Sequence, residues 1–177
     1  MFNFVKNIFN KDNSKTKERV VRFKDRHALG LDCYNASDLE LRYGRFYMKI
    51  YDSEDYDGKR DLAGPKEDKS YIADATMGLF EVFRDVVKLN WLDYEGNPIE
   101  YEFRFEDIFK DKIIPHKKED EDLIFWSDPL GGTPGIIIEV DNRTLNIYLD
   151  ADILLEIPNS NRLKSRHDKI LVFSKTF

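Results

Sequence analysis

Residues 127–140 read SDPLGGTPGIIIEV, and their glycines raise the question of a phosphate-binding loop. Such a loop presents backbone N–H groups at the start of a helix and adds a lysine that contacts the phosphates. Here Pro134 removes one N–H donor, the stretch contains no lysine, and the isoleucines that follow favour a strand. We therefore interpret the stretch as a turn that leads into a strand.

Residues 53–64, SEDYDGKRDLAG, match a calcium-binding loop only in part. Asp55 and Asp57 occupy the third and fifth positions of such a loop. Ser53 stands where the first aspartate belongs, and Gly64 replaces the bidentate glutamate at the twelfth position. Losing these two carboxylates removes most of the charge that would hold the ion. The pattern indicates a solvated loop, and we predict no metal site.

The other residues that could do chemistry lie far apart in the sequence. His27, His116 and His167 show no paired spacing of the kind found in zinc enzymes, so we expect surface or core histidines. Cys33 is the only cysteine, and its neighbours indicate a packing role and no disulfide framework. We therefore predict no catalytic residue and no cofactor.

Residues 116–126, HKKEDEDLIFW, join a cluster of charges directly to an apolar stretch that we expect to be a strand. One interpretation is a solvated loop. The other is an acidic docking surface with aromatic neighbours, because protein interfaces combine charges that steer association with aromatic side chains that anchor it.

The composition predicts one soluble globular domain. The chain has 177 residues, of which 41% are hydrophobic and 35% are charged. No stretch approaches the roughly 20 apolar residues of a membrane-spanning helix. Asn3 and Lys6 interrupt the apolar start of the chain, so we expect no signal peptide. With a single cysteine, these features favour the cytoplasm.

The charge is distributed unevenly along the chain. Residues 1–26 contain eight basic and three acidic residues, a net charge of +5. Because the whole chain carries −6, residues 27–177 carry −11. Such an acidic body repels nucleic acid and attracts a basic protein partner. The alternative is that the acidity only keeps the protein soluble.

The chain divides into a short leader and one domain. Apolar residues at helical spacing in 2–10 predict a short amphipathic helix, and the polar residues 11–18 predict a connector. Residues 19–177 form the domain. Within it, residues 38–52 alternate as a strand, but the parity of the apolar positions changes at Gly44, which we interpret as a one-residue bulge.

The remaining patterns predict an α+β fold. Residues 86–105 alternate on both sides of the turn YEGN, which indicates a hairpin with Glu100 and Glu102 on its wet face. Residues 135–150 form a second hairpin, and 169–174 form a last strand. Short helices are expected at 70–85, 106–113 and 151–157. The predicted architecture is a mostly antiparallel sheet built from hairpins, with a few short helices packed on one face.

The general character of the chain resembles that of bacterial immunity proteins, which are small acidic cytoplasmic domains that neutralise a toxin. This resemblance implies a non-enzymatic protein that occludes the active site of a basic toxin domain. The expected contact residues are acidic side chains that steer and one aromatic anchor: Asp55, Asp57, Glu100, Glu102, Glu119, Asp120, Glu121, Asp122 and Trp126.

Two other functions remain open from the sequence. The first is a hydrolase or nucleotide-processing enzyme that uses dispersed carboxylates with His116 or His167. The second is a structural or phage-type interaction protein whose N-terminal segment docks elsewhere. The sequence also leaves self-association open.

Overall fold

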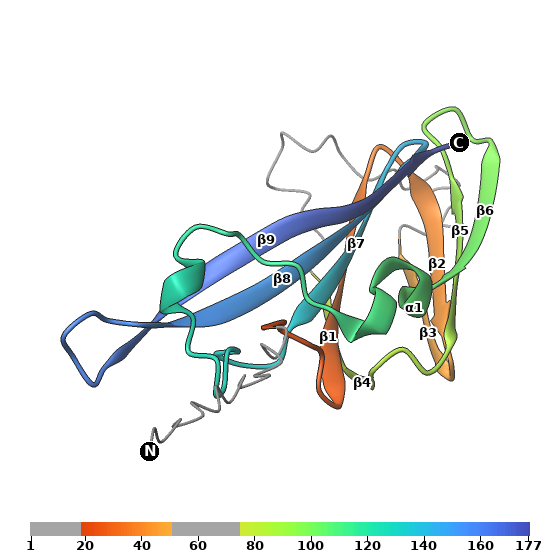
Figure 1. The fold of residues 1–177 in the computed structure, drawn as a ribbon. Coiled ribbons are helices and arrows are strands. Elements are labelled where there is room, and N and C mark those ends of the chain that lie inside the picture. Colours follow the sequence, from red (N-terminus) through yellow and green to blue (C-terminus); the bar gives the residue numbers. More distant parts are fainter. Residues whose placement is uncertain (1–18, 51–74) are drawn as a thin grey trace, which may run out of the picture.

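A computed structural model describes residues 19–50 and 75–177 of the chain, which form two β-sheets (Figure 1). The five-stranded sheet has the order β4-β1-β7-β8-β9, with bounds Ala75–Glu81, Arg26–Tyr34, Gly135–Asp141, Thr144–Glu156 and Leu163–Thr176. The four-stranded sheet has the order β3-β2-β5-β6, with bounds Phe46–Ile50, Ser37–Tyr43, Val86–Leu92 and Pro98–Arg104. Every pairing between these strands is antiparallel except the one between β1 and β7.

One hydrophobic core joins the two sheets. In β8, alternate residues from Leu145 to Leu155 are buried, because successive side chains of a strand point to opposite faces. The buried face of β5 contributes Leu89 and Trp91 to the same cluster. The predicted fold, dominated by antiparallel strands, is confirmed, but the strands form two sheets, and β1 pairs with β4 and β7 outside any hairpin.

The β5–β6 hairpin has the predicted faces. Leu89 and Trp91 are buried, Tyr101 is half-buried, and Glu100 and Glu102 are exposed. Leu89 pairs with Tyr101 in register. The alternation in the sequence therefore correctly predicts one buried face and one solvent-exposed face.

The predicted bulge in residues 38–52 is wrong, because β2 and β3 form a hairpin. Tyr43 pairs with Phe46, and the turn between them consists of Gly44 and Arg45. Gly44 has φ = 59°, a backbone region that favours glycine. A two-residue turn shifts the parity of the apolar positions just as a bulge does, so the pattern had two structural explanations.

The predicted helix at 70–85 is also wrong within the described residues. Ala75–Glu81 is strand β4, which pairs with β1 in antiparallel register. The register shifts next to Leu29, which is paired with Gly78, and Gly78 has φ = 113°. Gly78, which disfavours a helix, therefore lies at an irregular pairing between two strands.

The predicted helix at 151–157 is instead the continuation of β8 to Glu156. Two neighbours stabilise this extension. β9 pairs with it on one side, from Ala151 opposite Asp168 to Glu156 opposite Leu163. On the other side, the isolated bridges of Ile153 and Leu155 continue the pairing beyond the end of β7. Pairing on both edges therefore overrides the helical spacing of the apolar residues.

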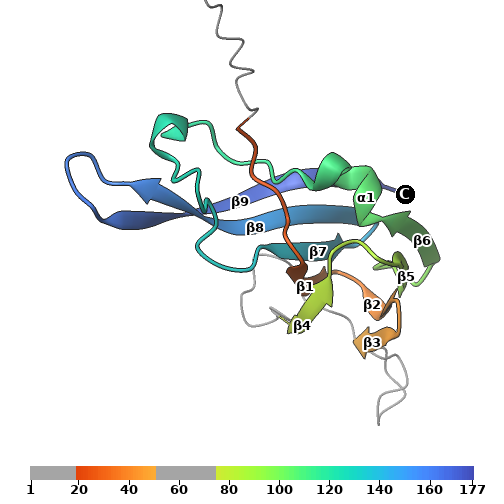
Figure 2. The same ribbon diagram turned by 60° about the horizontal axis from the view of Figure 1, so that its bottom comes forward.

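Helical structure is limited, in the part of the chain that the structure describes, to α1 Phe105–Ile108, η2 Lys110–Lys112 and η3 Glu121–Leu123. The first two match the helix expected at 106–113 only in part, because the helical turn ends at Ile108 and Asp111 in η2 has a left-handed backbone with φ = 55°. Figures 1 and 2 show that the chain from α1 to η3 runs along the β8–β9 hairpin, which projects beyond the other strands. Phe105, Phe109 and Ile114 of this segment are buried in the core.

Several predictions from the sequence lie outside the described residues. These are the amphipathic helix at 2–10, the connector at 11–18, and the whole loop at 53–64 with Asp55 and Asp57.

Candidate functional site

The acidic residues 119–122 form an exposed turn, here called the acidic turn. All four side chains are exposed. Asp120 has a left-handed backbone with φ = 61°, and η3 follows it. The backbone N–H of Leu123 donates to the carbonyl of Asp120 at 2.8 Å, which closes the turn. The turn therefore presents four carboxylates from a hydrogen-bonded backbone.

The chain after the acidic turn is attached to β8. Ile124 forms an isolated bridge with Leu155, and the N–H of Phe125 donates to the carbonyl of Leu154 at 2.9 Å. The strand expected at 123–126 is therefore a single bridge, because Trp126 and Ser127 already form the next turn.

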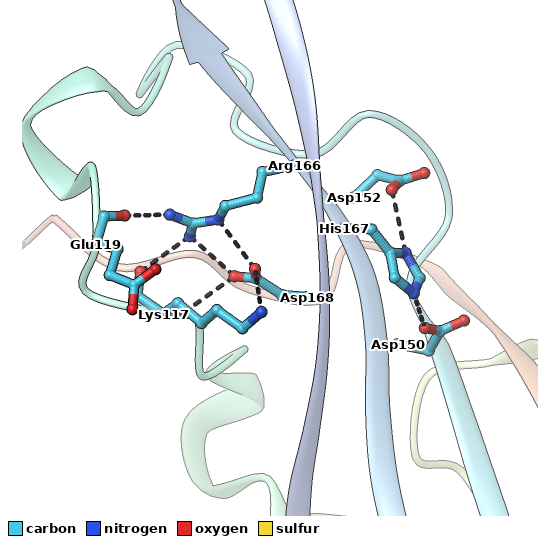
Figure 3. A network of polar contacts seen from close by, with 7 residues as sticks. All are labelled: Lys117, Glu119, Asp150, Asp152, Arg166, His167 and Asp168. Atoms are coloured by element: carbon cyan, nitrogen blue, oxygen red, sulfur yellow. Dashed lines mark hydrogen bonds and ion pairs between the residues drawn. The ribbon is translucent and has the colours of Figure 1, made fainter.

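The chain before the acidic turn is attached to β9 by Arg166 and Asp168, which lie on one face of that strand (Figure 3). Asp168 is fully buried and Arg166 is largely covered. The guanidinium donates to both carboxylate oxygens at 2.9 Å, the bidentate geometry that gives strong ion pairs.

The Arg166–Asp168 pair also binds the backbone that enters the acidic turn. The N–H of Lys117 donates to Asp168 Oδ2 at 3.0 Å, and Arg166 Nη2 donates to the carbonyl of Lys117 at 2.9 Å. Arg166 Nη1 donates to the carbonyl of Glu119. Because a buried charge is costly unless it is paired and hydrogen-bonded, these contacts fix the backbone of the turn relative to β9.

Trp126, the predicted aromatic anchor, is half-buried beside the acidic turn. Its ring lies edge-on to His116 at 6.1 Å between centroids, and the guanidinium of Arg19 lies 6.0 Å from the ring centroid. Its Nε1 atom is buried, and no acceptor for it lies among the described residues. Part of the indole therefore packs against side chains of the protein itself.

Glu100 and Glu102 lie apart from the acidic turn. They belong to β6, which is at the opposite end of the molecule from η3 in both ribbon views. Glu102 forms an ion pair with Lys88 at 2.8 Å, and Arg42 lies on the same face. The structure thus brings together residues 119–122 and Trp126, and it separates them from the two glutamates.

One cluster that the sequence did not predict surrounds His167, on the opposite face of β9 from Asp168 (Figure 3). The Nε2 atom of His167 lies 2.9 Å from Asp150 Oδ1, and its Nδ1 atom lies 3.3 Å from Asp152 Oδ1. Both neighbours are carboxylates, so whichever ring nitrogen carries a proton has an acceptor within reach.

The chemistry available to His167 is restricted. A general base needs a free lone pair, and both nitrogens face carboxylates. The hollow beside it, which Gly132 and Thr133 also line, has a volume of about 130 Å³. Ligand sites usually measure about 300–1,000 Å³. Within the described residues, no group of three or more His, Cys, Asp or Glu side chains could hold a metal ion.

The other residues that could do chemistry are buried in the core or form a turn. The GGTPG stretch is a loop that enters β7, as predicted, and the N–H of Gly131 donates to the carbonyl of Asp152 at 2.8 Å. Cys33 is fully buried, and burial, with Asp141 and Asp32 nearby, raises the pKa of its thiol to about 12. Burial lowers the pKa of His27, which therefore packs as a neutral ring.

The sequence contained a signal for both missed clusters. Arg166 and Asp168 are two residues apart, as are Asp150 and Asp152, and such residues share a face of a strand. A helix at 151–157 and a last strand that begins at 169, both predicted from the apolar residues, hide this signal. The attachment of Asp168 to Lys117 has no local sequence signal, since the two are 51 positions apart.

Comparison with protein families, curated proteins and solved structures found no match for this chain. None of the helices within the described residues has the length and apolar character needed to cross a membrane.

Proposed function

We propose that this protein acts by binding, and that its partner is a basic protein domain, as in a bacterial immunity protein that occludes the active site of its toxin. The observation that carries the proposal is the acidic turn: its four carboxylates are exposed, and the backbone that enters it is bound to β9 by the buried Arg166–Asp168 pair. A fixed loop loses less conformational entropy on binding than a free one.

The proposed mechanism separates steering from anchoring. The exposed carboxylates of residues 119–122 accelerate association with a basic surface, and the part of Trp126 that is exposed adds apolar contact. Inhibition then follows from steric occlusion, without chemistry by this protein. A cytoplasmic location belongs to the same proposal, because an immunity protein protects the cell that makes it.

Charge reversal tests the proposal. The chain is immobilised and used to capture proteins from the source cells, and it is compared with a variant in which Glu119, Asp120, Glu121 and Asp122 are replaced by lysine. We expect the unmodified chain to retain one stoichiometric basic protein and the variant to lose it. The fold survives the change, because exposed charges contribute little to stability.

The matched control uses the acidic residues at the other end of the molecule. Replacing Glu100 and Glu102 by lysine changes the charge in the same direction, but it leaves the acidic turn intact. If this control loses the partner and the fourfold variant keeps it, the binding site is the face of β6. If no basic protein is captured at all, the proposal is wrong.

A second function is favoured by one observation, the placement of His167 between Asp150 and Asp152. In a hydrolase or nucleotide-processing enzyme, a protonated His167 would act as a general acid. Turnover of phosphate esters or nucleotides by the isolated chain, lost on His167→Ala and kept on His116→Ala, would establish this alternative.

A further inference from the structure

The end of β4 and the β2–β3 turn enclose a cleft between the two sheets, remote from the acidic turn. The cleft has a volume of about 730 Å³, within the range of small-molecule sites. Strands β3 and β4 reach it with Phe46 and Glu81, whereas their other ends, Ile50 and Ala75, adjoin the chain segment outside the described residues. The cleft is thus formed by described residues.

The floor of the cleft is aromatic. Tyr43, Phe46 and Phe80 line it, and the Phe80 ring lies 5.3 Å from each of the other two rings between centroids. The planes of Phe46 and Phe80 lie at 84° to each other, so a planar group can stack on the face of one of these rings but not on both. Below them, Tyr43 Oη lies 3.2 Å from Nε2 of the buried His27, which fixes the position of the floor.

The rim of the cleft carries one cation that is not paired with a carboxylate in the described chain. Arg84 is paired with Glu81 at 2.5 Å, whereas Arg45 has no ion pair there and is exposed. Asp85 packs against the turn: a side chain at Gly44 would come within 2.5 Å of its carboxylate. The rim therefore offers Arg45 to an anion and Asp85 to a hydrogen-bond donor.

We propose that this cleft binds a small molecule that combines a planar ring with an anionic group, of the size of a mononucleotide. The ring stacks on the face of Phe46, the anion contacts Arg45, and Asp85 accepts a hydrogen bond from an amino group of the ring. This site is independent of the acidic turn and of the proposed function.

Calorimetric titration with three probes separates the contributions. Adenosine 5′-monophosphate carries the ring and the anion, adenosine carries only the ring, and ribose 5-phosphate carries only the anion. We expect the monophosphate to bind about tenfold more tightly than either of the others, because one charge-assisted contact and one stacked ring each contribute a factor of about that size.

Variants of the residues that line the cleft test whether the probes bind there. Arg45→Ala is expected to reduce the affinity for the monophosphate to that for adenosine, and Phe46→Ala to that for ribose 5-phosphate. Arg162→Ala, a change of an exposed arginine in the β8–β9 loop, is the matched control and leaves all three affinities unchanged. The proposal is overturned if the monophosphate binds no more tightly than ribose 5-phosphate, or if Arg45→Ala has no more effect than the control.

Discussion

The two ends of the molecule each contain a buried aspartate, an arginine and a tryptophan, yet the three residues are arranged differently. At the β5–β6 turn, Asp93 is buried and accepts hydrogen bonds from the backbone N–H groups of Glu95 and Asn97, at 3.0 and 2.8 Å. At the acidic turn, Asp168 binds chain that is 51 positions away. The first aspartate stabilises its own turn, and the second holds another segment in place.

The arginines at the two ends of the molecule also differ in what they bind. Arg143 donates to Asp93 at 2.8 Å and to the carbonyl of Phe177 at 2.7 Å, so it joins two turns and the end of β9. Arg166 donates to backbone carbonyls of the segment that enters the acidic turn. Similar charged pairs thus hold different parts of the chain: Asp93 and Arg143 join neighbouring turns and the end of β9, whereas Asp168 and Arg166 hold the backbone that enters the acidic turn.

The largest expected effect comes from the tryptophan of the β5–β6 end. Trp91 is fully buried, and its Nε1 donates to the carbonyl of Asn142 at 2.7 Å. Trp91→Ala should lower the free energy of unfolding by about 3–5 kcal/mol, since it leaves a large cavity. Urea denaturation measures this. A loss no greater than that of Trp126→Ala would contradict the comparison.

The next effect concerns Asp168. Asp168→Ala leaves Arg166 without its carboxylate and the N–H of Lys117 without its acceptor, and breaking such a buried pair costs about 3 kcal/mol or more. The variant should also weaken capture of the basic partner, although the acidic turn keeps its charge. Denaturation and capture are measured on the same preparation, at a temperature at which the variant is folded. Unchanged capture would show that the turn needs no attachment.

The third prediction concerns how the stabilisation by Asp93, at the β5–β6 turn, depends on pH. Burial by itself would raise the pKa of Asp93, but hydrogen bonds from Asn97, Arg143 and Glu95 lower it to about 2, below its ordinary value of 3.8. The stabilisation is therefore complete above about pH 4 and is lost as the pH falls towards 2.

Asp93→Asn tests that pH dependence. The difference in unfolding free energy between the unmodified chain and the variant should be present at neutral pH and shrink towards zero near pH 2. Denaturation curves at several pH values measure it. A difference that is constant with pH would mean that the charge of Asp93 contributes nothing.

The smallest effect is expected at Trp126. Its buried Nε1 has no acceptor among the described residues, so Trp126→Phe removes no described hydrogen bond. We expect a change in unfolding free energy of about 1 kcal/mol or less, smaller than that of Trp91→Phe, which leaves the Asn142 carbonyl without its donor. The measurement is a paired denaturation of the two variants.

What the sequence predicted correctly are the elements with a local signal. The alternation of Leu89 and Trp91 with polar residues determined both faces of the β5–β6 hairpin. The parity change at Gly44 was informative too, but a turn and a bulge produce the same change, and only the partner strand distinguishes them.

What the sequence did not predict depends on distant partners. Residues 151–156 are a strand because β9 and the bridges of Ile124 and Leu130 pair with them. The candidate site shows the same limit. The carboxylates of residues 119–122 and Trp126 were identified by type, whereas Arg166 and Asp168, which hold them, were identified only from the fold.

The parallel pairing of β1 with β7 has a consequence for how the chain folds. Ala28 pairs with Gly135, 107 positions later, so the five-stranded sheet cannot be completed until most of the chain has been synthesised. Such non-local pairing is typical of domains that fold in milliseconds to seconds, because loop closure must precede the contacts. Until β7 arrives, the apolar residues Leu29 and Leu31 of β1 lack their final neighbours, and apolar surface left exposed in this way promotes aggregation of partly folded chains.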